Sequence, residues 1–424
     1  MEGDDAVSMI SRRTLLAAAV GTAVAACTES TPTVAAGSAS STVDQTSASA
    51  ASTTTPAAAT TTASGRPVLR LIGDGSTSDT GPQPHQPTPR PLAPGETPPQ
   101  FVVFSWDGAG NLATGQFPRF RSLAADLGAS MTFFLTGTYA LPVDRRELYH
   151  PPQHRVGASA IGLFNRDEVL ATMSEIGLAW IDGHEIGTHF NGHFCGTNGA
   201  GRWSPQEWRS EIDQAVGFVQ TWRTNAAAPD APPLPFDYAT ELVGGRAPCL
   251  EGQKNLLPAA AELGWRYDAS SPGGSQVWPT KKSGLWDLPL QSIPFAGDGA
   301  HQTLSMDYNL MYKQNGGDPD GDPARFAEWR TQAYQSYLAG FTRALTSNRA
   351  PMFIGNHFEQ WNGGIYMDAV EQVLTTIAAH EDVRLVSFRQ LVDWLDVQDP
   401  AVIARLRTLS PGVAPTGGWR TFLA

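Results

Sequence analysis

Short apolar runs alternate with amphipathic stretches from about residue 100 to residue 400 of the chain. Apolar runs of strand length cover residues 101–104, 131–136, 351–355 and 383–387. A helical period is clear from Ala324 to Leu345, and a second helix is predicted from Gln390 to Leu395. This alternation predicts one α/β domain over residues 99–400, with mostly parallel strands.

Polar side chains follow several of the predicted strands. Asp107 follows the first strand, His357 follows the run at 351–355, and Arg246 lies in the sequence Gly-Gly-Arg-Ala-Pro. In barrels of parallel strands and helices, catalytic side chains gather at the C-terminal ends of the strands. We therefore expect Asp107, Arg246 and His357 to lie close together.

A histidine pair stands in the sequence Gly-Thr-His-Phe-Asn-Gly-His-Phe, where His189 and His193 are four residues apart. On a helical turn both rings lie on one face. Two imidazoles can occupy two corners of a zinc site and leave room for a carboxylate and water. The alternative is a polar loop with solvated histidines.

The nearby sequence His184-Glu185 does not form a zinc-protease motif with His189. That motif requires histidines at i and i+4 on a helix, whereas this gap is five residues and contains Gly187. We interpret His184 as a buried structural histidine.

The N-terminus has the features of an export signal. Ser11-Arg12-Arg13 begins a twin-arginine pattern, a small apolar run follows, and Cys27 stands at the end of a lipobox-like sequence. Residues 1–27 are therefore predicted to be a signal, with Cys27 lipidated and the protein anchored on the outer face of the cell membrane. An ordinary cleaved signal is the alternative.

The segment after the signal is rich in Ser, Thr, Ala and Pro. Residues 28–98 are predicted to be a disordered tether, although residues 67–72 have the pattern of a short strand. Residues 401–424 are a C-terminal tail to which the sequence assigns no role.

Charge and cysteine content limit the partners. The net charge of −12 argues against nucleic acid and strongly anionic glycans. Besides Cys27 there are Cys195 and Cys249, which form a disulfide or are two separate small buried residues; the sequence leaves both open.

Several motifs in order resemble those of the polysaccharide deacetylases, which include chitin and peptidoglycan deacetylases. The resemblance covers roughly residues 100–396. The matching segments are residues 104–108, 131–137, 183–193, 246–248, 267–270, 277–279 and 354–357. The resemblance implies a distorted, incomplete (β/α) barrel.

The resemblance also implies roles for individual residues. His189 and His193 would bind zinc or another divalent metal, which polarises the substrate carbonyl and activates water. The acid-base and positioning roles would fall to Asp107 as general base, His357 as general acid and Arg246 as the partner of the base carboxylate. Trp278 would line the substrate pocket, and Trp106 is a further predicted substrate contact. Trp361, just past His357, is predicted from its position to stack on a sugar ring, with half-buried packing as the alternative.

One carboxylate of the family pattern is missing. The family has adjacent base and metal-ligand aspartates, and here Asp107 stands alone. We prefer the alignment in which Asp107 is the base and Gly108 replaces the ligand. In the shifted alignment Asp107 is the ligand and Trp106 replaces the base. In either alignment the site is one carboxylate short. Either Asp107 serves as both base and metal ligand, or Glu359 or Asp268 supplies the second carboxylate.

These features predict a metal-dependent hydrolase that removes N-acetyl groups from a cell-wall or chitin-like glycan. The missing carboxylate leaves an alternative, a catalytically impaired glycan-binding lipoprotein of the same fold. A further alternative is an esterase or amidase that acts on another acylated substrate.

Overall fold

The computed structural model describes residues 61–62, 64–298 and 301–424. The predicted signal, Cys27 and the first part of the tether lie outside the described residues. No helix in the described part of the chain is long and apolar enough to cross a membrane.

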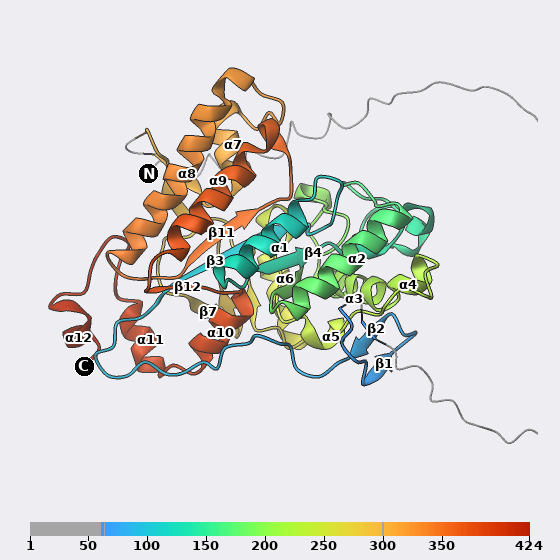
Figure 1. Cartoon of the computed structure of the whole chain (residues 1–424), viewed down its shortest axis with the longest axis horizontal. Coiled ribbons are helices and arrows are strands. Elements are labelled where there is room, and N and C mark those ends of the chain that lie inside the picture. The colour runs from blue at the N-terminus through green and yellow to red at the C-terminus, as the bar shows by residue number, and fades with distance from the viewer. Residues whose placement is uncertain (1–60, 63, 299–300) are drawn as a thin grey trace, which may run out of the picture. The chain divides into compact units, whose positions relative to one another are not determined.

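The centre of the domain is a five-stranded parallel sheet (Figure 1). Its strands are β3 (Gln100–Asp107), β4 (Thr132–Leu135), β5 (Glu185–Thr188), β11 (Met352–Asn356) and β12 (Val383–Leu385). The order is β11-β3-β4-β5, and β12 pairs with the first part of β3 while β4 pairs with its last part. The α/β class with parallel strands is therefore confirmed.

Single bridges continue this sheet at both edges. Thr188 pairs with Gly245 beyond β5, and Gly355 pairs with Met306 beyond β11. The first bridge places Arg246 at the same edge as Asp107, as its position in the sequence predicted. The distorted, incomplete barrel stays a prediction.

Three smaller sheets surround the central one. A three-stranded sheet has the order β6-β8-β7, and two hairpins pair β1 with β2 and β9 with β10. The bounds are β1 (Arg70–Ile72), β2 (Thr77–Asp79), β6 (Tyr267–Asp268), β7 (Thr280–Lys282), β8 (Leu285–Asp287), β9 (Ser292–Pro294) and β10 (Gln302–Leu304).

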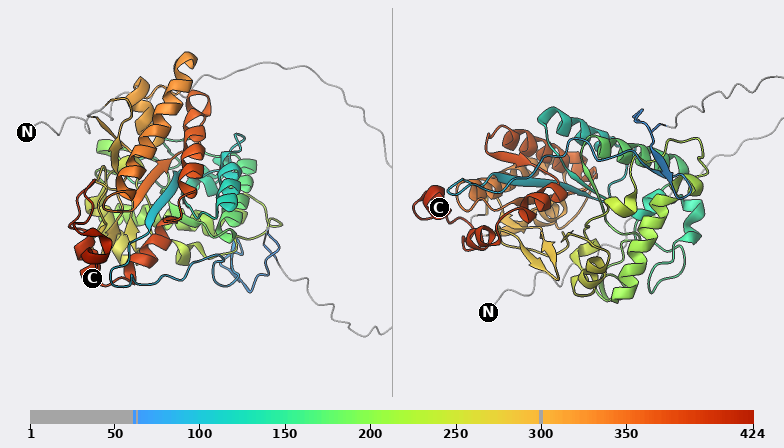
Figure 2. Two further views of the ribbon diagram at one scale, coloured as in Figure 1. Left: turned by 60° about the vertical axis from the view of Figure 1, so that its left-hand side comes forward. Right: turned by 90° about the horizontal axis from the view of Figure 1, so that it is seen from below.

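Helices flank the central strands, and α8 and α9 lie side by side along β11 (Figures 1 and 2). The helices are α1 (Gln116–Leu127), α2 (Arg166–Ile181), α3 (Pro205–Gln220), α4 (Trp222–Asn225), α5 (Tyr238–Glu241), α6 (Gln253–Glu262), α7 (Asp307–Asn315), α8 (Phe326–Leu345), α9 (Trp361–Ala378), α10 (Phe388–Asp396), α11 (Pro400–Leu406) and α12 (Gly418–Phe422). Short 3-10 turns are η1 (Gly137–Ala140), η2 (Val143–Leu148), η3 (Gly196–Asn198), η4 (Pro248–Leu250) and η5 (Pro323–Arg325).

Capping residues account for the starts of three helices. Asn165, Ser204 and Ser387 each form a capping box. The side chain of the capping residue accepts a hydrogen bond from a backbone N–H in the first turn, and the Glu or Gln side chain three residues later accepts one from the backbone N–H of the capping residue. The two predicted helices are confirmed as α8 and α10. The predicted start of α10, at Gln390, is two residues too late because the prediction did not take Ser387 as the N-cap.

The side chains of β3 enter two cores. Val102, Phe104 and Trp106 belong to one buried cluster, and Phe101 and Val103 belong to the other. Side chains of a strand alternate between its faces, and a central parallel strand is covered on both. β3 is therefore buried along its whole length, which fixes Asp107 at its end.

Residues 64–98 differ from the predicted tether. The β1-β2 hairpin docks on the domain, where Ser78 Oγ donates to Leu234 O over 2.7 Å and Trp222 Nε1 donates to Ser76 O over 2.8 Å. Further along, Gln83 Nε2 donates to the carbonyls of Trp180 and His184. The polar composition is explained by these backbone-directed hydrogen bonds, which need little apolar side-chain surface.

Candidate functional site

Asp107 and Arg246 form a buried ion pair at the end of β3. Arg246 Nη1 lies 2.7 Å from Asp107 Oδ1 and 2.9 Å from Ser105 Oγ. The rest of the guanidinium donates from Nε to Ala269 O and stacks on the ring of Phe134, 4.9 Å from its centroid. Arg246 is therefore locked in one orientation toward Asp107.

This pair controls the charge of Asp107. Burial alone would raise the pKa of the carboxyl, but Arg246 and the neighbouring histidines outweigh burial and hold the pKa below its usual range. Asp107 is therefore a carboxylate at neutral pH. The family resemblance assigns this contact with Arg246 to the general base.

His189 and His193 are close together, although the predicted helical turn is wrong. Phe190 and His193 have φ of 59° and 55°, so the segment is an irregular loop. The two ring centroids are nevertheless 5.1 Å apart. The two rings are therefore close together, as the i, i+4 spacing predicted, but an irregular loop and not a helical turn brings them there.

His189 has the orientation of a metal ligand. Its Nδ1 lies 2.7 Å from the carbonyl oxygen of Arg246, so Nδ1 carries the proton and Nε2 has a free lone pair. Burial lowers the pKa of His189, and it lowers the pKa of His193 to about 3. Both imidazoles are therefore neutral, which is the form that binds metals.

A network of buried hydrogen bonds holds the loop that carries His189 and His193. Tyr149 Oη donates to Glu211 Oε1 over 2.7 Å and accepts from the Gly192 N–H over 2.9 Å. Asn191 Nδ2 donates to the carbonyl oxygen of Glu211. No motif in the sequence predicts this network, because Tyr149 and Glu211 lie far from the histidine motif along the chain.

His357 forms a dyad with Asp307, which we did not predict. Asp307 is fully buried at the start of α7, its Oδ1 lies 2.8 Å from His357 Nδ1, and its Oδ2 accepts from the His357 N–H over 2.6 Å. Burial favours a low pKa, but Asp307, Asp107 and Glu359 outweigh it and raise the pKa of His357 to about 9. His357 is therefore protonated at neutral pH.

Trp361 is the one predicted tryptophan that lies beside the site. Its ring centroid is 5.2 Å from that of His357, and its side chain is half-buried. The predictions for Trp106 and Trp278 are not supported, because both are fully buried. Trp106 packs among Phe120 and Phe358, and Trp278 donates from Nε1 to Asn348 O inside the second core.

The structure also places the two candidate substitutes for the missing carboxylate. Asp268 lies on β6, where it accepts from Ser270 Oγ over 2.6 Å, and burial raises its pKa to about 6. Glu359 is exposed and close enough to His357 to raise the pKa of that ring. His184 accepts from the Met131 N–H over 3.1 Å in the core, as expected for a structural residue.

Gly108 leaves space where the family pattern has a metal ligand. Its φ of 64° lies in the left-handed region, and a Cβ there would stand 3.7 Å from both Thr136 Oγ1 and Tyr139 Oη. Thr136 Oγ1 is buried and has no hydrogen-bond partner. A small polar side chain would therefore fit at position 108.

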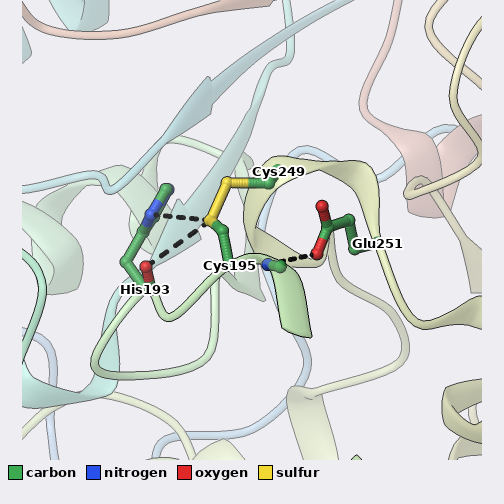
Figure 3. The surroundings of a disulfide bond; sticks show 5 residues. His193, Cys195, Cys249 and Glu251 are labelled. Atoms are coloured by element: carbon green, nitrogen blue, oxygen red, sulfur yellow. Dashed lines mark hydrogen bonds between the residues drawn. A yellow bond between two sulfur atoms is a disulfide. The ribbon is translucent and has the colours of Figure 1, made fainter. Parts of the chain in front are cut away.

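Cys195 and Cys249 form a disulfide, which settles the alternative that the sequence left open (Figure 3). The bond joins the histidine loop to the turn that follows Arg246. Glu251 Oε2 also accepts from the Gly196 N–H over 2.7 Å. The two loops that carry His193 and Arg246 are thus tied together.

We expect Cys195→Ser with Cys249→Ser to lower the free energy of unfolding by about 2–4 kcal/mol, because the bond closes a loop of 54 residues in sequence. Guanidinium unfolding of the oxidised protein and of the double variant measures the difference. An unchanged midpoint and slope would show that the bond does not stabilise the domain.

Asp107, His189 and His193 have the right donor atoms for a divalent metal, but their spacing is wider than a metal site needs. Among the residues that the structure describes, the one group of three metal-binding side chains within 4.8 Å of one another is His193, Cys195 and Cys249. The predicted set of Asp107, His189 and His193 is not drawn together that closely. The neutral imidazoles and the orientation of His189 are those of metal ligands. What the site lacks is a second carboxylate, beside Asp107, as a further metal ligand.

No protein-family profile matches the sequence, and no curated protein does. Solved structures do show similarity. A protein described as a polysaccharide deacetylase from Mycobacterium smegmatis is 16% identical, with a TM-score of 0.44 over 72% of this chain and 93% of that one. The chain is similar to CE4 family proteins.

Two structures of carbohydrate esterase family 4 (CE4) proteins have comparable scores. A family 4 carbohydrate esterase from Streptomyces lividans, solved with acetate, is 14% identical, with a TM-score of 0.32 over 66% of this chain and 90% of that one. A CE4 family pseudoenzyme from Bacillus anthracis is 11% identical, with a TM-score of 0.37 over 72% of this chain and 70% of that one.

Proposed function

We propose that the chain is a divalent-metal-dependent hydrolase that removes N-acetyl groups from a cell-wall or chitin-like glycan. The observation that carries the proposal is the meeting of a charged carboxylate, two neutral imidazoles and a protonated imidazole at one edge of the sheet. His189 and His193 would hold the ion, with zinc as the expected metal. When bound, the ion would polarise the acetyl carbonyl and acidify water.

The remaining residues have roles that follow from their charge states. Asp107 is ionised and fixed by Arg246, so it accepts the proton of the attacking water as general base. His357 is protonated at neutral pH and donates its proton to the leaving amine. Asp307 orients the His357 ring and keeps it charged, and Trp361 offers an aromatic face to a sugar ring.

The proposed place of action is the outside of the cell. The twin-arginine pattern and Cys27 support export and lipid anchoring, and the segment after Cys27 would let the domain reach a wall polymer. Metabolic labelling with a radioactive fatty acid tests the anchor, since Cys27→Ser should abolish incorporation. Labelling that persists in this variant would contradict it.

The substrate bond is tested with matched N-acetylated and O-acetylated sugars. Acetate release from chitin oligomers and peptidoglycan, with little release from an O-acetylated xylan, would support N-deacetylation. Release from the ester alone would favour the alternative esterase. The protonated state of His357 supports the amide, because an amine leaving group needs a proton more than an alcohol does.

Asp307→Asn should move the alkaline limb of the pH–rate profile. In the wild type, activity should persist up to about pH 9, where His357 loses its proton. Without the Asp307 charge, burial lowers the pKa of His357, so the limb should move down by at least about one pH unit. An unchanged limb would show that another group limits the rate at high pH.

The missing carboxylate is tested by Gly108→Asp. Aspartate tolerates the left-handed backbone better than most residues, and position 108 has space for it. We expect metal affinity to rise about tenfold or more, together with the rate. Gly108→Asn is the matched control, because it has the same size and backbone tolerance without the charge.

The outcome of that comparison also tests the alternative of an impaired glycan-binding protein. An inactive wild type that gains turnover with Gly108→Asp would support loss of catalysis through the missing ligand. An active wild type that gains nothing would show that another group already completes the site.

A further inference from the structure

Three potential metal ligands lie together beside the proposed ion site, and one of them, His193, also belongs to it. The sulfurs of Cys195 and Cys249 and an imidazole nitrogen of His193 are all within 4.8 Å of one another, and both cysteines are exposed (Figure 3). The His193 Nδ1 lies 3.8 Å from Cys195 Sγ. In the oxidised chain the sulfurs are bonded to each other, so they are not thiolate ligands.

The spacing matches what a tetrahedral site needs. Zinc–sulfur and zinc–nitrogen bonds of about 2.3 Å and 2.0 Å place neighbouring ligand atoms about 3.5–3.8 Å apart. The nitrogen–sulfur distance already has this value. The two sulfurs must separate, and the Cys249 sulfur must reach the same spacing from the imidazole nitrogen, from which it lies within 4.8 Å; rotation of the exposed cysteine side chains allows both.

We propose that opening the Cys195–Cys249 disulfide creates a thiolate metal site from Cys195, Cys249 and His193. A dithiol reductant supplies two electrons and two protons, becomes a disulfide itself and leaves two cysteine thiols. The metal ion then replaces both thiol protons, which pass to solvent, and two sulfur–metal bonds form. Water occupies the fourth position, as in open zinc sites with three protein ligands.

Other contacts keep the two loops together after the bond opens. Glu251 Oε2 accepts from the Gly196 N–H over 2.7 Å, and His189 Nδ1 is bonded to the Arg246 carbonyl. These ties do not involve either sulfur. The ligands therefore stay close in the reduced protein, and metal binding does not have to bring together distant segments.

The reduced site has a consequence for deacetylase activity, and this consequence alone rests on the proposed function. His193 belongs to both ligand sets, and a neutral imidazole has one nitrogen lone pair for a metal, so it cannot serve both sites at once. Thiolate capture would withdraw His193 from His189. Reduction in the presence of zinc should therefore lower deacetylase activity, and reoxidation should restore it.

Cobalt(II) binding tests the site without any need for turnover. The full chain with Cys27→Ser leaves Cys195 and Cys249 as its only cysteines. A phosphine reductant opens the disulfide, taking oxygen from water to become the phosphine oxide. We expect a thiolate-to-cobalt charge-transfer band in the near ultraviolet from the reduced protein and none from the oxidised protein, at one ion per chain.

Three variants identify the ligands. Cys195→Ser and His193→Ala should each weaken cobalt binding by tenfold or more, and His193→Ala should retain a weaker band from the two thiolates. His154→Ala is the matched control, because His154 stacks on Phe194 in the same region and belongs to neither ligand set. It should bind cobalt as the parent does.

Two results would overturn the proposal. The first is a reduced, folded protein that binds no more cobalt than the oxidised one. The second is a band that His193→Ala leaves unchanged in strength and affinity. A failed deacetylase assay does not affect either reading, because the charge-transfer band reports binding alone.

Discussion

Asp107→Asn is expected to lower the rate of acetate release by about 10²–10⁴-fold. The substitution keeps the size of the side chain and removes the carboxylate that Arg246 positions and keeps charged to accept a proton from water. Arg246 holds the carboxylate over 2.7 Å, and an amide in its place is a negligible base. The measurement is kcat with a chitin oligomer at saturating metal.

The same variant should be less stable, so folding must be measured beside activity. Removing one partner of a buried ion pair costs about 3–5 kcal/mol, because the other charge is left buried without compensation. Ser105→Ala is the matched control, since it removes a 2.9 Å hydrogen bond to the same guanidinium and leaves Asp107 intact. It should keep most of the activity. A folded Asp107→Asn protein with wild-type turnover would refute the role of Asp107.

His357→Gln is expected to lower deacetylation by a similar factor of about 10²–10⁴. The reason is the loss of the proton that His357 holds up to about pH 9 beside Asp307. Glutamine keeps a hydrogen-bonding side chain of comparable length but cannot transfer that proton. The rate is measured near pH 7 with an N-acetylated oligomer.

An activated aryl acetate separates proton donation from other effects of this substitution. Its leaving group departs without a proton, so His357→Gln should lower its hydrolysis by less than about tenfold. Trp361→Phe changes the ring next to position 357 and leaves the His357 proton in place, so it measures the loss that comes from substrate contact and packing. Equal losses on the amide and the activated ester would show that His357 binds or positions the substrate instead.

The central strands and the residues at their ends were predictable because each depends on a local pattern. Buried parallel strands are continuous apolar runs, and their C-terminal ends meet at one edge, so Asp107 and Arg246 were expected to approach. The motifs also indicated that His189 and His193 lie near these residues, even though the two histidines are on an irregular loop.

What the sequence missed depends on long-range packing. Asp307 lies 50 residues before His357 and has no motif of its own, so only the fold shows the dyad. Trp106 and Trp278 were assigned to substrate because a motif alone does not show which way a side chain points; β3 turns Trp106 into the core. β1 lies within the short strand predicted at residues 67–72, but the docking of the rest of residues 64–98 was missed because it relies on hydrogen bonds from polar side chains.

The most direct test of the central claim is acetate release by the full chain from chitin oligomers and peptidoglycan. The assay is run with added zinc, then with a chelator, and then with zinc restored. The account predicts release that the chelator abolishes and zinc restores. Absence of release from both glycans at saturating metal, or release that the chelator does not change, would contradict it.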